Sequence, residues 1–210
     1  MRSWEAHRTV LHGVSRAYRH CLPLAHMALG LSRTEVQGGP MEGTDAGLLI
    51  LRVSVGIVML AHGYNHLFGG GKIEGTGRWF ESLGMKPGKL HAWLATLTEL
   101  VVGPMLILGL LTPIAAAGAV GLLLVALITN HLRNGFFIFR PGEGYEYVMT
   151  LILVSVAIGA LGAGEWSLDN ALGVDWVGWC GLVVAAGIGG LSAALLLVIF
   201  WRPLAREAAK

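Results

Sequence analysis

Charged residues are scarce in this 210-residue chain. Lys, Arg, Asp and Glu make up only 13% of it, whereas hydrophobic residues make up 54%. A soluble domain carries roughly 25% charged residues, so the chain has about half the usual number of groups that interact with water. Its apolar residues also form blocks of about 18 or more nearly uncharged positions, which is the length that crosses a bilayer as a helix. The composition therefore excludes a soluble fold and predicts an all-α integral membrane protein.

Cysteine is scarce too, and the motifs that bind common cofactors are missing. Cys21 and Cys180 are the two cysteines, and they do not form a C-x-x-C pair. This excludes a disulfide framework and a cysteine zinc site. The sequence also lacks a dinucleotide-binding glycine fingerprint, a P-loop and a cysteine set for haem or iron–sulfur clusters. No cofactor is detectable in the chain itself, so we expect it not to be catalytic alone.

The chain divides into three segments by composition. Residues 1–40 hold five arginines and no apolar run long enough to span a bilayer. They form a tail that is either an interfacial helix or disordered, unless Met41 is the true start. Residues 41–172 are expected to form a four-helix membrane domain. Residues 173–210 are expected to add a fifth transmembrane helix and a short basic tail.

Five apolar blocks mark the expected spans, and Thr112-Pro113 lies between the second and the third. These residues are expected to act as N-cap and first helical residue, so that the second and third spans form a tight hairpin. The glycine-rich loop 68–89 is expected to hold a short surface helix at about 77–83. The expected spans are at about 47–67, 91–111, 113–131, 145–161 and 177–201.

Basic residues predict the orientation. With five spans, one side of the membrane receives the loops 68–89 and 132–144 and the C-terminus, which carry nine Lys or Arg residues. The opposite loops, 111–113 and 162–177, carry none. Basic loops stay in the cytoplasm, so the sequence predicts a multi-pass plasma-membrane protein with its C-terminus inside. Glycines in the last helix, at 187, 189 and 190, are compatible with a homo-oligomer.

Polar residues inside the spans are the candidate functional residues, because ionisable groups at that depth cost a few kcal/mol and normally face the bundle interior. On the first span, Arg52, Met59, His62 and His66 fall within an arc of about 80°. At about 1.5 Å per residue, Glu99 and His62 come to nearly the same depth. The predicted polar cluster contains Arg52, His62, His66, Glu99, His131, Asn134 and Glu146.

Three interpretations of this cluster compete. In the first, Arg52 and Glu99 form a structural ion pair that locks two helices together, and His66 extends toward the interface. In the second, the cluster handles protons or binds a small polar or quinone-like molecule. In the third, His62 and His66 ligate a metal; no third ligand is evident nearby, so we expect no metal.

Several stretches resemble the DoxX family of membrane proteins. The stretch LLILRVSVGIVMLAHGYNHLFG is similar to the opening helix of that family, and LTELVVGPMLILGLLTPIAA to its glutamate-containing hairpin. NHLRNGFF, GYEYVMTLILVSVAI and GAGEWSLDNALG resemble the remaining motifs in the same order. The chain departs from the family at His66, where many relatives carry a lysine, and in its fifth helix. The resemblance implies a four-helix membrane bundle.

The resemblance also implies functions. Some members are small subunits of a thiosulfate:quinone oxidoreductase, and actinobacterial relatives are linked to complexes in thiol and oxidative-stress defence. The first expectation is a membrane subunit or scaffold that holds soluble redox or sulfur-transfer enzymes at the cytoplasmic face. The second is a quinone-proximal subunit, with quinone as its ligand, and the third is a small-molecule transporter. The expected partners are the lipid bilayer and such enzymes, and nucleic acid is not among them.

Overall fold

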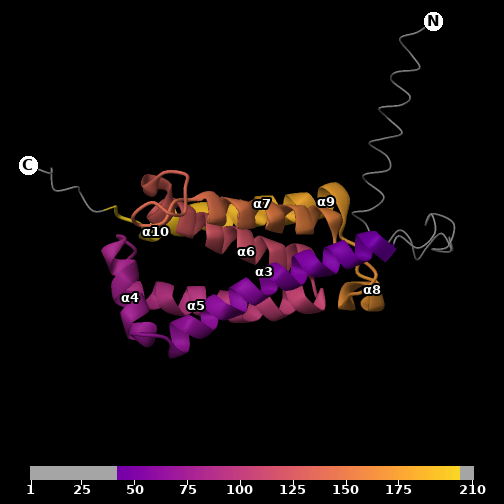
Figure 1. The fold of residues 1–210 in the computed structure, drawn as a ribbon, viewed down its shortest axis with the longest axis horizontal. Helices are drawn as coiled ribbons and strands as arrows, with labels where there is room; N and C mark the ends of the chain where they lie inside the picture. The colour runs from indigo at the N-terminus through magenta and orange to yellow at the C-terminus, as the bar shows by residue number, and fades with distance from the viewer. Residues whose placement is uncertain (1–41, 204–210) are drawn as a thin grey trace, which may run out of the picture.

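The computed structural model describes residues 42–203, and helices dominate this part of the chain (Figure 1). The predictions made for residues 1–40 lie outside the described residues. In chain order the elements are α3 (Glu42–Phe68), α4 (Lys72–Ser82), α5 (Gly88–Leu108), α6 (Thr112–Ala126), the π turn η2 (Leu127–His131), the 3₁₀ turn η3 (Leu132–Asn134), α7 (Glu146–Leu161), α8 (Leu168–Leu172), α9 (Gly178–Leu182), the π turn η4 (Val183–Ile188) and α10 (Gly189–Phe200).

The expected all-α membrane bundle is confirmed. Four continuous helical stretches are long and apolar enough to cross a bilayer, and α7, at the fourth expected position, is a shorter apolar helix. All five expected spans are present with ends shifted by a few residues, and the surface helix is longer than expected, because α4 begins at Lys72. The protein is a multi-pass membrane protein. The four long stretches are Gly43–Phe68, Gly88–Leu108, Thr112–Asn134 and Gly178–Phe200.

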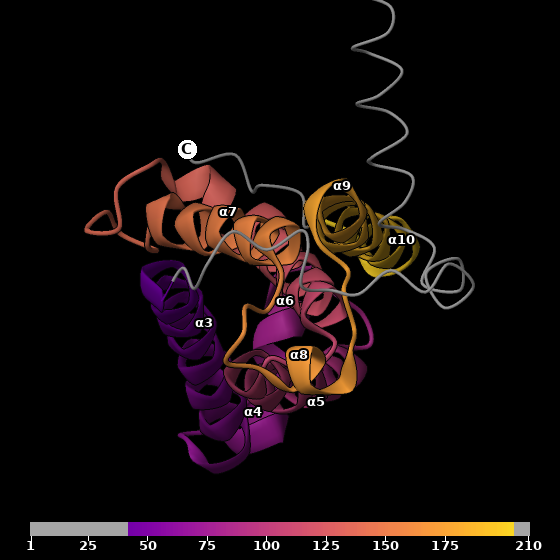
Figure 2. The ribbon, with the colours of Figure 1, turned by 90° about the vertical axis from the view of Figure 1, so that its right-hand side faces the viewer.

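The third span, which begins with α6, lies at the centre of the bundle (Figure 2). Small residues let the third span occupy this central position, and Ala115, Ala116 and Ala119 are almost fully buried in it. A Cβ added at Gly189 of α10 would meet the Ala117 carbonyl and the Val120 side chain. Small side chains let helix backbones approach closely, which is how membrane helices gain van der Waals contact. Alanine and glycine thus allow α6 to pack against α5, α7 and α10.

The hairpin between α5 and α6 closes differently from the prediction. Helix α6 begins at Thr112 and its N-cap position is Leu111, so Thr112 is not the N-cap. The carboxylate of Asp169 on α8 accepts the N–H groups of Leu111, at 2.6 Å, and of Thr112, at 2.8 Å. An acidic side chain here satisfies amides that the helix cannot pair itself. The cap is therefore supplied from far along the chain, by the loop after α7.

The two ends of the bundle differ in charge. Helix α4, the loop 135–145 and the C-terminal end of α10 lie at one end, and the start of α3 and α8 lie at the other (Figure 1). The first end, called the basic end below, carries Lys72, Arg78, Lys86, Lys89, Arg133, Arg140 and Arg202. The other end, called the acidic end below, carries Asp45, Glu165, Asp169 and Asp175.

A clasp at the basic end joins the C-terminal end of α10 to the loop between α4 and α5. The Trp201 indole N–H donates to the Leu83 carbonyl at 2.9 Å, and the Arg202 N–H donates to the Gly84 carbonyl at 2.8 Å. Gly84 has a φ of 87°, and a Cβ on it would collide with the Arg202 carbonyl. The clasp therefore requires glycine at position 84.

We expect Gly84→Ala to lower the free energy of unfolding by about 1–3 kcal/mol, because it combines backbone strain with a collision in the clasp. Thermal unfolding of the detergent-solubilised protein measures this. The matched control is Gly70→Ala, since Gly70 has no atom within 4 Å of an added Cβ. Equal melting temperatures for the two variants would contradict the clasp.

Candidate functional site

Arg52 is fully buried in α3, with none of its surface exposed. Its guanidinium donates to the carbonyl oxygens of Leu106 at 3.1 Å and Ile107 at 3.3 Å, both at the end of α5. It also donates to the carbonyl of Trp166, before α8, at 2.7 Å. Helix ends leave carbonyls without partners in the helix. Arg52 supplies a donor to the Ile107 and Trp166 carbonyls and a second donor to the Leu106 carbonyl, which also accepts the Gly109 N–H.

The expected ion pair between Arg52 and Glu99 is wrong. In the described part of the chain, the hydrogen bonds of Arg52 go to backbone carbonyls, and the carboxylate that acts on its charge is Asp169. The reason is depth. Arg52 lies near the acidic end, level with the end of α5, where free carbonyls are available, whereas Glu99 lies about two turns further into the bundle.

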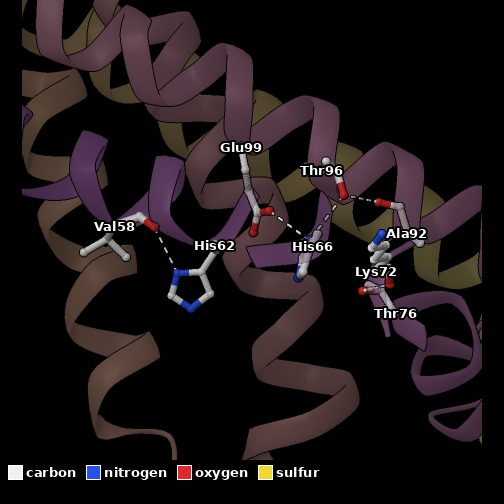
Figure 3. A network of polar contacts seen from close by, with 8 residues as sticks. All are labelled: Val58, His62, His66, Lys72, Thr76, Ala92, Thr96 and Glu99. Carbon is white, nitrogen blue, oxygen red and sulfur yellow. Dashed lines mark hydrogen bonds and ion pairs between the residues drawn. The ribbon is translucent and has the colours of Figure 1, made fainter. Parts of the chain in front are cut away.

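The partner of Glu99 is His66 (Figure 3). His66 Nδ1 lies 3.1 Å from Glu99 Oε2 and 3.3 Å from the Thr96 hydroxyl oxygen. The Thr96 hydroxyl donates to the Ala92 carbonyl at 2.7 Å, so its oxygen is free to accept the His66 N–H. Glu99 Oε2 is close enough for an ion pair but lacks an aligned hydrogen bond. The contact is therefore electrostatic, and this oxygen keeps its capacity to accept a hydrogen bond.

His62 and His66 exchange the places expected for them. His66 was expected to extend toward the interface, but it turns inward to Glu99. His62 was expected beside Glu99, but its side chain is exposed, and its ring N–H donates to the Val58 carbonyl at 2.9 Å (Figure 3). On α5, Thr96, Glu99 and Gly103 are all buried.

A cavity of about 480 Å³ lies beside this pair. Its wall includes His62, His66 and Glu99 from the predicted cluster, together with residues of α4, α6, α7 and α10. A volume of this size is within the range of small-molecule sites, which are mostly apolar with a few polar groups that orient the ligand. Its apolar lining includes Met59, Phe80, Met85, Leu122, Leu123 and Leu196.

The π turn η2 brings His131 to the same cavity. Turns of this kind are rare and often occur at functional sites. The His131 N–H donates from Nδ1 to the Glu143 carbonyl at 3.0 Å, and Nε2 lies 3.3 Å from the amide nitrogen of Asn130. His131, Asn130 and Glu143 all contribute to the cavity wall.

Asn134 and Glu146 hold the neighbouring loop in place. The Asn134 amide donates to the carbonyls of Asn130, Gly142 and Glu143. Glu146 accepts the N–H of Ile138 at 3.0 Å. Neither Asn134 nor Glu146 contributes to the cavity wall. The structure thus divides the expected cluster into Arg52 near the acidic end, four residues at the cavity and two loop residues.

The sequence reasoning missed two polar groups of importance. His91 stands at the start of the second expected span, and in the structure it is 2% exposed and lines the cavity. Its position two helical turns before Glu99 is the signal in the sequence. Asp169 lies in the expected loop 162–177, and its contact with Leu111 and Thr112 joins positions far apart in sequence, so no local pattern indicates it.

Comparisons with known proteins agree with this architecture. The DoxX family model matches residues 47–132. A Bacillus subtilis protein named "Putative oxidoreductase CatD" is 30% identical over 125 residues, which cover 60% of this chain and 86% of that protein. The chain belongs to the DoxX family.

A second DoxX-like relative comes from Mycobacterium tuberculosis. This "Uncharacterized membrane protein Rv3486" is 29% identical over 133 residues, covering 60% of this chain and 80% of the relative. No solved structure matches the chain significantly. The DoxX match includes Arg52, His62, His66, Glu99 and His131 and ends before α7.

We expect Arg52→Leu to destabilise the fold by about 3–5 kcal/mol, because it leaves Asp169 and three carbonyls without their cation. Because Arg52 does not pair with Glu99, adding Glu99→Leu should bring no recovery. Folded yield in membranes and melting temperature in detergent measure both effects. Recovery of the double variant to the wild-type yield would support an ion pair between Arg52 and Glu99 and contradict the observed contacts.

Proposed function

We propose that this protein is the membrane subunit of an oxidoreductase and that its cavity binds a membrane quinone. The observation that carries the proposal is the Glu99–His66 pair in the wall of a largely apolar cavity. A quinone has the matching chemistry, with an apolar ring and tail and two polar oxygens. The relative that bears an oxidoreductase name supports a redox role.

Proton handling gives Glu99 and His66 a role in this proposal. Reduction of a quinone takes up two protons along with two electrons, and buried acid–base groups within hydrogen-bond reach can supply them. Glu99 is 3% exposed, and Glu99 and His66 are 3.1 Å apart, so a proton can pass between them. The sequence carries no dinucleotide or iron–sulfur motif, so the electron donor belongs to another protein.

Glu99→Gln should lower the rate of quinone reduction at least about tenfold, because Gln keeps the shape but cannot hold the charge or exchange the proton. The measurement is quinone reduction in native membranes, together with the quinone that copurifies with the protein. The matched control is Glu74→Gln. Glu74 is exposed on α4, paired with Lys89 at 2.6 Å, which lowers the pKa of Glu74. Equal quinone binding and reduction in the two variants would defeat the proposal.

A second function has support in the charge of the basic end. We propose that this end faces the cytoplasm and holds a soluble redox or sulfur-transfer enzyme there. Seven described Lys or Arg residues lie at or beside this end, whereas the opposite end carries acidic residues. Such a surface attracts an acidic partner over distances of about one Debye length, roughly 8 Å at physiological salt.

Charge neutralisation tests the docking surface. We expect Lys72, Lys86 and Arg140 changed together to Gln to release the copurifying soluble enzyme and to remove the salt dependence of its binding. Glu165 and Asp175 changed to Gln and Asn form the control at the other end. The readout is the amount of that enzyme pulled down from native membranes at two salt concentrations. Loss in the control alone, or in neither, would contradict docking at the basic end.

A further inference from the structure

Within residues 42–203, two buried polar atoms of the cavity wall have no hydrogen-bond partner. They are Glu99 Oε2 and His91 Nε2, on residues that are 3% and 2% exposed. Buried polar groups in native proteins are nearly always paired, so each exception needs an explanation. Both atoms belong to α5 and line the same cavity, so a ligand there can supply both missing partners.

His91 faces the cavity with an acceptor atom. Its ring packs against Phe80 and Phe200, with ring centroids 6.1 and 5.0 Å away. The backbone of Lys86 is the polar neighbour of the ring, and we place the ring N–H toward it. A neutral imidazole has one N–H and one lone pair in the ring plane. Because Nε2 has no partner of its own, it is left with the lone pair and can accept a hydrogen bond.

Glu99 also presents an acceptor. His66 Nδ1 lies between the Thr96 hydroxyl oxygen, at 3.3 Å, and Glu99 Oε2, at 3.1 Å, and Oε2 has no aligned donor among the described residues. A carboxylate oxygen only accepts hydrogen bonds. Both unpaired atoms of the wall are therefore acceptors, and a ligand that donates a hydrogen bond at each of its ends would pair them both.

The axial separation of residues 91 and 99 is close to the length that a six-membered ring with two hydroxyls can bridge. Positions 91 and 99 are separated by about 12 Å along the helix axis. Two hydroxyls at opposite corners of an aromatic ring reach acceptors roughly 11 Å apart when each hydrogen bond is about 2.8 Å long. Between the two residues lies Ala95, which also lines the cavity and whose small side chain leaves room for the ring.

From these contacts we infer that the cavity prefers the reduced form of its ligand, a quinol. One hydroxyl donates to His91 Nε2 and the other to Glu99 Oε2, with the ring over Ala95. This inference rests on the proposed quinone binding and adds which redox form is held more tightly. A quinone would place two carbonyl oxygens against two acceptors, so it gains neither hydrogen bond.

The preference has a redox consequence. We expect the quinol to bind about tenfold more tightly than the quinone, with the two buried hydrogen bonds each contributing about half of that difference in binding free energy. Because the reduced form is the one stabilised, the midpoint potential of the bound couple rises. For a two-electron couple, a tenfold ratio of the two dissociation constants raises it by about 30 mV. A quinone held here is thus a stronger electron acceptor than the same quinone in the lipid.

The test measures the dissociation constants of decylubiquinol and decylubiquinone, anaerobically, for the full chain in phosphatidylcholine nanodiscs. Wild-type protein should bind the quinol about tenfold more tightly. His91→Phe keeps the packing against Phe80 and Phe200 but removes one of the two acceptors, so the preference for the quinol should fall to about threefold, the part that Glu99 supplies. His91→Gln supplies a carbonyl acceptor and should recover most of the preference.

Two further variants test the position of the ring. Ala95→Phe fills the space between the acceptors and should abolish binding of both forms. Leu97→Phe, on an exposed face of the same helix that does not line the cavity, should leave both constants unchanged.

The outcomes separate the two proposals. Equal constants in the wild-type protein, or a tenfold preference that survives in His91→Phe, would overturn the inference and leave quinone binding intact. Failure of the wild-type protein to bind either form would overturn quinone binding and the inference together.

Discussion

A fully buried arginine must find acceptors for its guanidinium, and the position of these acceptors sets how α3 packs in this protein. Arg52 meets the carbonyls at the end of α5 and the carbonyl of Trp166. Asp169, which comes soon after Trp166 in the sequence, caps α6. Arg52 thus joins the first span to the end of the second and to the segment after α7, and Asp169 joins that segment to the start of the third span. In an apolar medium an unpaired carbonyl costs several kcal/mol, so this arrangement leaves little freedom for the helices to slide.

The same contact determines what happens at the other end of the α3–α5 pair. With Arg52 held level with Leu106, the helix brings His66 alongside Glu99 and Thr96 about four turns later. The position of the functional pair therefore follows from a structural contact about 20 Å away along α3. The cavity beside the pair needs small residues on α6 and the π turn that directs His131 toward it.

Much of the fold could be predicted from the sequence, because hydropathy and length alone determine which segments cross a bilayer. The five spans, the hairpin and the gathering of basic loops at one end follow from these local properties. The site was harder. The arc on α3 correctly placed Arg52, Met59 and His66 on the packed side, but depth alone suggested the wrong partners. Which carboxylate lies beside which cation depends on how two helices are displaced along each other, and that displacement depends on Arg52 and on a loop far away in sequence.

His91 shows a second limit of the sequence. A histidine near a helix start is ordinary, and its importance comes from α4 and α10, which bury it between Phe80 and Phe200. These two helices come before and after α5 in the chain, so no local sequence pattern indicates that they pack around His91. Burial in a dry environment is what turns an unremarkable ring nitrogen into an acceptor that needs a partner.

The central claim is that a membrane quinone occupies the cavity beside Glu99 and His66. The most direct measurement is labelling of the protein in native membranes with a photoreactive quinone analogue, followed by mass spectrometry of the labelled residues. The account predicts labels on the inward face of α5 around Ala95 and on α3 around Met59 and His66, and competition by excess natural quinone. Labels confined to outward side chains such as Leu97 and Val101, or insensitive to competition, would contradict it.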